Sequence, residues 1–271
     1  MNFTVLGGDL RSVYLCRRLM KDGYTVRCFG LELSDVPQSC RSDTLTAALK
    51  DTDCVVLPIP SAEGTLLKAP YSCAPIPLDT VAQALPKGTP VFGSKCTLPV
   101  TDLTAIETMA VGNAALTAQS ALLLILQNTH RALMGQRVLI LGAGRIGTLL
   151  GLQCKALGAE VTVTSRSPER RAWCTAVGMD TACTHKLSHI LPAQDMVVNT
   201  IPAPVLDSAS LSLLPTGTLL LELASLPGGF DSSQAEALGL QTVMGRGLPG
   251  KYTPAGAADI IAETIYKELN L

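Results

Sequence analysis

The run Gly142-Ala143-Gly144-Arg145-Ile146-Gly147 carries the G-x-G-x-x-G spacing in the middle of the chain. It directly follows an apolar run at 137–141 and opens a segment with helical periodicity, which is the context that a dinucleotide-binding turn requires. In such a turn the first glycine permits a tight bend, the second lets the backbone approach a pyrophosphate, and the third lets the helix pack against the strand. The helix N-terminus then faces the anion. The spacing therefore predicts a dinucleotide site, with a glycine turn that binds nothing as the alternative.

The end of the next expected strand indicates which dinucleotide would bind. That strand ends on Ser165, Arg166 and Ser167. An NAD site usually places Asp or Glu here, about 20 residues after the glycines, to accept hydrogen bonds from the ribose 2′-hydroxyl. A guanidinium fork instead suits a 2′-phosphate, because it can bond two oxygens at once. The residues therefore favour NADP over NAD, and Arg170 and Arg171 either add charge or form a solvated helix face.

Two later segments are expected at the same edge of the sheet. Asn199-Thr200-Ile201-Pro202 ends a predicted strand, where ligands of parallel sheets bind, although Asn199 could simply cap a helix there. Leu223-Ala224-Ser225 opens a loop rich in Gly and Pro, and such loops often carry function. The candidate cofactor-binding residues are Gly142, Ala143, Gly144, Arg145, Ile146, Gly147, Ser165, Arg166, Ser167, Arg170, Asn199, Thr200, Ile201, Pro202, Leu223, Ala224 and Ser225.

The elements that must position these residues follow from hydrophobic periodicity. Short apolar runs alternate with amphipathic segments along the whole chain, which is typical of a parallel sheet with right-handed crossovers. We expect an α/β protein with two Rossmann-like, doubly wound parallel-sheet domains joined by long helices. Strands are expected at 3–6, 24–29, 53–58, 90–93, 137–141, 160–164, 196–199 and 218–223, and helices at 11–20, 113–133, from the glycine run to 157, 168–177 and 254–269.

The long helical pattern before the glycine run marks the domain junction. We expect an N-terminal substrate or catalytic domain at 1–115, to which a C-terminal helix within 254–271 returns. A linking helix at 116–134 then leads into an NADP-binding Rossmann domain at 135–253.

Composition narrows the class of partner and the compartment. The 271 residues are 47% hydrophobic and 16% charged, with a net charge of −1, so neither nucleic acid nor an anionic membrane is an expected partner. The N-terminus has no basic region typical of a signal peptide, and the apolar stretch at 114–126 is shorter than the roughly 20 residues that span a bilayer. The nine cysteines are odd in number and contain no C-x-x-C pair. They predict reduced core residues in a cytoplasmic protein, with no metal site.

Several motifs resemble the A subunits of bacterial dipicolinate synthase. The similarity extends over nearly the whole chain and is strongest after Gly135. It rests on Val5-Leu6-Gly7-Gly8-Asp9-x-Arg11, Leu57-Pro58, Asn113, Thr117, the glycine run, Asn199-Thr200-Ile201-Pro202, Leu223-Ala224-Ser225-x-Pro227-Gly228-Gly229-x-Asp231 and Gly247-Leu248-Pro249-Gly250.

The resemblance implies an NADP-dependent oxidation of dihydrodipicolinate to dipicolinate during sporulation, together with a second, flavoprotein-like subunit. The substrate would carry two carboxylates, so its pocket should present cations, and Arg11, Lys95 and Lys251 are candidates, although both lysines could be ordinary surface residues. Asp9 is a general base or, as its position favours, a helix cap. The chain departs from the family at Gln119, where Glu is expected, and at Ala255, where Lys is expected. The candidate catalytic residues are Asp9, Arg11, Ser94, Lys95, Thr117, Ser225 and Lys251.

Other functions remain open on the same fold. A 2-hydroxyacid dehydrogenase would place a His acid–base in the cleft, and His130, His185 and His189 are not expected there. A shikimate-type dehydrogenase would need a Lys–Asp pair, of which Lys95 and Asp102 are a weak version. A protein that binds NADP without catalysis, as a subunit or sensor, is the alternative from another class. A homo-oligomer is an expected partner, but the sequence leaves the oligomeric state open, because the apolar helix faces of each domain could pack on the other domain or on another chain.

Overall fold

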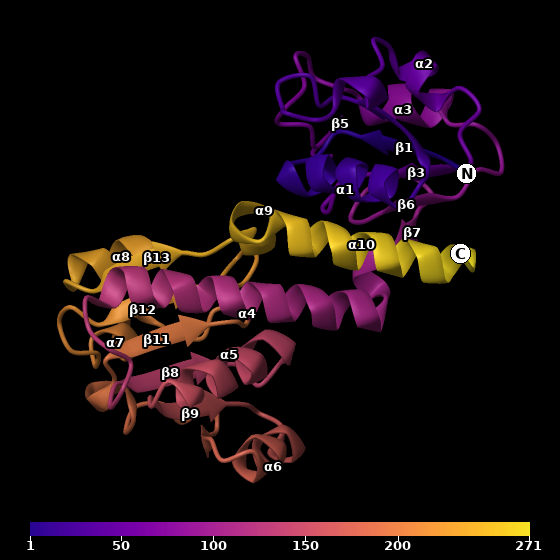
Figure 1. Ribbon diagram of the computed structural model, residues 1–271. Coiled ribbons are helices and arrows are strands. Elements are labelled where there is room, and N and C mark those ends of the chain that lie inside the picture. The colour runs from indigo at the N-terminus through magenta and orange to yellow at the C-terminus, as the bar shows by residue number, and fades with distance from the viewer. The chain divides into compact units, whose positions relative to one another are not determined.

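Figure 1 shows the computed structural model of the chain, which describes residues 1–271. The chain forms two compact units. The first unit combines Met1–Asn113 with Pro249–Leu271, and the second unit is Ala114–Leu248. Each unit is built on its own parallel sheet, which confirms the expected pair of Rossmann-like α/β domains.

The first unit contains a five-stranded sheet in the order β2-β1-β3-β6-β7, with every pair of neighbours parallel. This is the flavodoxin-like order, in which the direction of strand addition reverses between β1 and β3. A crevice outside the carboxyl ends of those two strands is therefore the expected place for a ligand. The strands are β1 (Asn2–Leu6), β2 (Thr25–Phe29), β3 (Cys54–Val56), β6 (Val91–Gly93) and β7 (Thr101–Asp102), and β4 (Ala62–Glu63) pairs separately with β5 (Leu66–Leu67).

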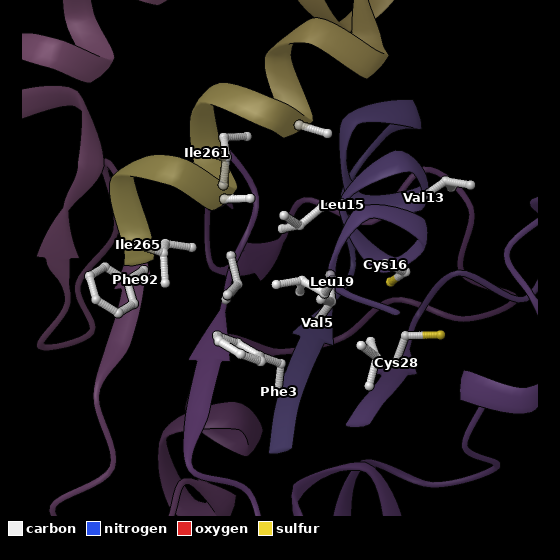
Figure 2. Packing of buried hydrophobic residues seen from close by; sticks show 14 of the residues in the cluster. Phe3, Val5, Val13, Leu15, Cys16, Leu19, Cys28, Phe92, Ile261 and Ile265 are labelled. Carbon is white, nitrogen blue, oxygen red and sulfur yellow. The ribbon is translucent and has the colours of Figure 1, made fainter. Parts of the chain in front are cut away.

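Two helices from opposite ends of the chain build the core of this unit. α1 (Leu10–Lys21) follows β1 directly, and α10 (Pro254–Leu269) packs along it. Leu15 and Leu19 of α1 and Ile261 and Ile265 of α10 are at most 5% exposed and belong to one core cluster with Phe3 of β1 (Figure 2). The remaining elements are η1 (Gln38–Cys40), α2 (Leu45–Leu49), α3 (Leu78–Ala84), η2 (Leu103–Ala105) and α9 (Leu248–Tyr252).

The second unit contains a six-stranded sheet in the order β10-β9-β8-β11-β12-β13, again parallel throughout. Numbered along the chain, this is the order 3-2-1-4-5-6 of dinucleotide-binding folds, with its switch point between β8 and β11. The strands are β8 (Arg137–Leu141), β9 (Glu160–Thr164), β10 (Asp180–Ala182), β11 (Met196–Asn199), β12 (Leu219–Glu222) and β13 (Gln241–Met244), and the helices are α5 (Arg145–Ala156), α6 (Pro168–Ala176), η3 (Leu191–Ala193), α7 (Ser208–Leu211) and α8 (Ser232–Ala237).

The long helix differs in its bounds from the helix expected at 113–133. α4 spans Glu107–Thr129, so it begins six residues earlier and ends four residues earlier. It ends where His130 takes a positive φ of 49°, a left-handed conformation that commonly stops a helix. With 23 residues, α4 is long and apolar enough to cross a membrane by length and composition alone. The shorter apolar stretch at 114–126 did not indicate this. Within the protein, 44% of the most apolar 18-residue stretch of α4 is buried.

Candidate functional site

Gly142, Gly144 and Gly147 of the glycine run differ in what a side chain at each position would contact. Gly142 has a φ of 108°, and a Cβ there would lie 2.5 Å from the Thr200 hydroxyl oxygen. A Cβ on Gly147 would lie 1.9 Å from the carbonyl oxygen of Gly142, because the first turn of α5 packs directly on the bend. A Cβ on Gly144, the N-cap of α5, would meet no atom within 4 Å. The fold itself therefore requires Gly142 and Gly147, whereas the open space at Gly144 suits a ligand that approaches the backbone.

A pocket of about 580 Å³ lies beside this turn, at the switch point between β8 and β11. Its volume falls in the ordinary range for ligand sites. The backbone cradle at Gly144 and the N-terminus of α5 provide the donors and open space that a dinucleotide pyrophosphate needs. The residues present therefore fit a nicotinamide dinucleotide. The lining residues are Gly142, Ala143, Gly144, Thr164, Ser165, Arg166, Ser167, Arg170, Thr184, His185, Thr200, Ile201, Pro202, Ala203, Pro204 and Val205.

One edge of the pocket is the turn that follows β9. The Ser165 hydroxyl accepts a hydrogen bond from the Ser167 amide at 3.2 Å, and the Ser167 hydroxyl caps α6 by accepting from the Arg170 amide at 3.2 Å. Arg171 donates to the carbonyls of Ser165 and Arg166, at 2.6 and 3.1 Å, and so braces the turn. Arg166 itself is exposed at the pocket. It is therefore the guanidinium best placed to meet a ligand here.

Two side chains close to Arg166 in the sequence, Ser167 and Arg170, already form hydrogen bonds within the protein. Arg170 donates to the carbonyl of Ala143, at 3.1 Å, which ties α6 to the glycine turn. The Ser167 hydroxyl donates to the Glu169 carboxylate, and this hydrogen bond lowers the pKa of Glu169. An anion bound at Arg166 would therefore have Arg170 as a second arginine in the lining of the pocket.

Asn199 and Glu222 form a buried polar centre at the ends of β11 and β12. The register of the sheet places the two residues side by side, and they are 0% and 1% exposed. The Glu222 carboxylate accepts hydrogen bonds from Asn199 Nδ2 at 2.8 and 3.0 Å, from the Ala224 amide at 2.8 Å and from the Gly229 amide at 2.7 Å. Asn199 also bonds the Ile201 backbone through both of its amide atoms. This centre fixes the paths of the two loops that follow the strands.

In the first unit, Asp9 and Arg11 lie at the switch point between β1 and β3. They line a narrow crevice with the last residue of β3 and the three residues after it, at 56–59. Asp9 caps α1, and its carboxylate accepts from Arg11 Nε at 2.9 Å and from Arg11 Nη2 at 2.8 Å. Burial raises the pKa of Asp9, but the hydrogen bonds and charge of Arg11 outweigh this effect and leave the pKa below its usual value. Arg11 is thereby held in one orientation beside Gly250, where a Cβ would lie 2.7 Å from Asp9 Oδ2.

The other candidate catalytic residues are scattered. Ser94 follows β6 and its hydroxyl is buried without a hydrogen-bond partner. Lys95 is exposed, with a φ of 51°, and Lys251 is exposed, with its ammonium 5.0 Å from the centre of the Tyr252 ring. In the second unit, Thr117 is buried in α4 and Ser225 is exposed in the loop after β12.

The pocket differs in part from the set of residues expected from sequence. Asn199, Leu223, Ala224 and Ser225 do not line it, and neither do Arg145, Ile146 and Gly147. Thr164, Thr184, His185 and residues 203–205 line it and were not expected. The position of Thr164 at the end of β9 was a usable signal, since ligands meet the carboxyl ends of strands. His185 lies in an irregular segment after β10, where periodicity carries no information.

The fold and the pocket define a dehydrogenase-like protein with a nicotinamide-dinucleotide-binding domain. Residues 114–224 match the family described as D-isomer specific 2-hydroxyacid dehydrogenase, NAD binding domain. Residues 2–111 match the family described as the N-terminal domain of the dipicolinate synthase A subunit.

The resemblance to the dipicolinate synthase A subunits is confirmed over the whole length of the chain. The chain is 27% identical to the dipicolinate synthase A subunit of Bacillus subtilis (strain 168), over 99% of this chain and 96% of that protein. The crystal structure of the dipicolinate synthase A subunit from Bacillus halodurans superposes with a TM-score of 0.88 at 25% identity, and covers 100% of this chain and 98% of its own. A transhydrogenase from Sinorhizobium meliloti shares the fold, with a TM-score of 0.72 at 18% identity over 98% of this chain and 92% of its own.

Proposed function

We propose that this chain oxidises dihydrodipicolinate to dipicolinate with NADP, as the A component of a two-subunit dipicolinate synthase that serves the bacterial spore. The full-length similarity to a dipicolinate synthase A subunit carries the proposal, because it includes both units and not the dinucleotide domain alone. The cytoplasm is the expected compartment. The expected partners are a flavoprotein-like second component, called the B component below, and further copies of this chain.

The second unit would hold the dinucleotide. Gly142 and Gly144 would present the backbone to the pyrophosphate, Arg166 would bind the 2′-phosphate with help from Arg170, and Thr200 would contact the nicotinamide half, since all five residues line the pocket. The dinucleotide, when bound, supplies the hydride acceptor. The substrate ring loses one hydride and one proton, and the aromatic product provides much of the driving force, so a strong general base is not required.

Arg11 is the side chain we assign to a substrate carboxylate. Its Nε and Nη2 bond Asp9, and Nη2 also donates to the carbonyl of Ile59 at 2.5 Å. These bonds fix the plane of the guanidinium and leave Nη1 for the substrate. Because the pKa of Asp9 is lowered by this pairing, the carboxylate stays ionised and acts as a positioning group for Arg11. Ser94, Lys95, Thr117, Ser225 and Lys251 remain candidates for further substrate contacts.

The activity is tested by mixing the purified chain with NADP and freshly generated dihydrodipicolinate. We expect NADPH and dipicolinate to form together, in equal amounts, faster than the spontaneous oxidation. Arg11→Leu should raise KM by about 10-fold or more, because a charge-assisted hydrogen bond contributes roughly 1.5–3 kcal/mol. Lys87→Leu, at an exposed position in the same unit, is the control. If no NADPH appears above the spontaneous rate, with or without the B component, the chain is not a dehydrogenase of this substrate.

The preference for NADP is tested at Arg166. Arg166→Asp should weaken NADP binding by roughly 10- to 100-fold, because it removes a charge-assisted bond and adds a repulsive carboxylate, while NAD binding should hold or improve. Dissociation constants from nicotinamide fluorescence measure both effects. Arg131→Asp changes the same charge at an exposed position outside the pocket and should alter neither constant. An unchanged ratio of NADP to NAD affinity in Arg166→Asp would rule out the phosphate role.

A second candidate function is to bind NADP without transferring hydride. Gln119 and Ala255 favour it, because they stand where the resemblance leads us to expect an acid and a base. The two functions separate cleanly in one experiment. A chain that binds NADP tightly yet forms no NADPH in the presence of the B component has the binding role alone.

A further inference from the structure

Three cysteines from separate elements meet in the core of the first unit. Cys16 lies on α1, Cys28 on β2, and Cys40 ends η1. Figure 2 shows Cys16 and Cys28 within the packed side chains between α1 and β2. The three sulfur atoms all lie within 4.8 Å of one another, and the Cys28 and Cys40 sulfurs are 3.6 Å apart. Each residue is at most 2% exposed.

The spacing of the sulfurs is close to that around a single metal ion. A zinc–thiolate bond is about 2.3 Å long, so three sulfurs bound to one ion lie roughly 3.7–4.0 Å apart. The observed limit of 4.8 Å reaches this spacing through small side-chain rotations. The carbonyl oxygen of Pro37, which accepts a hydrogen bond from Cys40 Sγ at 3.0 Å, offers an additional metal-ligand atom beside the sulfurs.

The charge of such a site would be balanced. Three thiolates and one divalent cation leave a net charge of −1, which is costly to bury unless an opposite charge lies near. Arg41 follows Cys40 directly, and the carbonyls of Ser34 at 2.7 Å and Val36 at 3.2 Å hold its exposed guanidinium on the same segment, where it supplies the opposite charge.

We propose that Cys16, Cys28 and Cys40 bind one soft divalent cation of the zinc class in a closed structural site. Thiolates select soft and borderline ions over the hard ions that prefer oxygen. The burial of all three ligands leaves no room for substrate, so the ion would be structural. It would tie the irregular segment 30–41 to α1 and β2, and this proposal does not depend on the proposed dehydrogenase activity.

The test titrates the reduced, full-length chain with Zn²⁺ and, separately, with Cd²⁺ under anaerobic conditions. We expect one ion per chain, a rise in Tm with Zn²⁺, and the ultraviolet charge-transfer band of a cadmium–thiolate complex with an intensity that corresponds to three sulfurs. Cys28→Ala should weaken Zn²⁺ binding by more than the ~100-fold that loss of an outer-shell partner costs. Cys54→Ala is the matched control, because Cys54 is equally buried on β3 of the same sheet but lies outside the cluster.

The cadmium band of the unaltered chain keeps the test decisive even if Cys28→Ala fails to fold. Absence of that band, or a band and affinity that Cys28→Ala and Cys40→Ser leave unchanged, would refute the site. A second result would also refute the site: the reduced chain binds neither ion, and on exposure to air it forms a Cys28–Cys40 disulfide. The cluster would then contain a pair of oxidisable thiols.

Discussion

Replacing Gly144 by alanine should abolish tight dinucleotide binding while leaving the fold intact, and replacing Gly147 should damage both. Gly144 has an ordinary φ of −87°, and a Cβ there meets nothing within 4 Å, so alanine fits the unliganded chain. The added methyl group occupies the space in which the pyrophosphate would meet the backbone. Since hydrogen bonds to charged groups contribute roughly 1.5–3 kcal/mol each, we expect affinity for NADP to fall about 10- to 100-fold.

The Gly147→Ala variant is the matched comparison. Its methyl group would lie 1.9 Å from the carbonyl oxygen of Gly142, and backbone atoms cannot move aside as a flexible side chain can. We expect the free energy of unfolding to fall by about 3 kcal/mol, at the upper end for overpacking. Urea denaturation and fluorescence titration with NADPH measure the two effects. A Gly144→Ala chain that binds NADPH normally would contradict the assignment of this turn to the pyrophosphate.

The central strands of both sheets could be predicted from the sequence, whereas β7 at one edge of the first sheet and both outer strands of the second could not. β8 and β11 are buried on both faces and are therefore nearly continuous apolar runs. β10 and β13 are edge strands with mixed, partly exposed residues, and they have neither a continuous run nor a clean alternation. Their pairing follows from the sheet beside them, which local periodicity does not describe.

The same distinction applies to the candidate site. The glycine turn could be predicted because its requirements lie within six residues, Gly142 to Gly147. The contact between Asn199 and Glu222 depends on the register of β11 against β12, and the cysteine cluster depends on how α1 packs over β2. Both join residues far apart in the sequence, and no spacing rule indicates them. The sequence places Asn199 among the candidate cofactor-binding residues, whereas in the structure its amide atoms are engaged by Glu222 and Ile201.

Glu222→Gln should destabilise the second unit more than any conservative change at its surface. Every group that contacts the Glu222 carboxylate is a donor: the Asn199 amide and the backbone N–H groups of Ala224 and Gly229. A glutamine would turn its own NH2 group toward at least one of these donors. An unpaired buried donor costs about 1–3 kcal/mol and breaking a buried charged network about 3–5 kcal/mol, so we expect a loss of roughly 3 kcal/mol. Glu160→Gln, with a side chain that is 65% exposed, is the control.

The functional consequence of Glu222→Gln follows from the two loops that the carboxylate holds. Loss of the bonds to Ala224 and Gly229 frees the loop after β12, and loss of the bond to Asn199 loosens the start of the segment 200–202 that lines the pocket. Turnover should therefore fall further than affinity for NADP, since the glycine turn and Arg166 are unaffected. A double-mutant cycle with Asn199→Ala, followed by urea denaturation, should give a coupling energy of about 0.5–3 kcal/mol. Additive effects would mean that Glu222 stabilises its own loop without orienting Asn199.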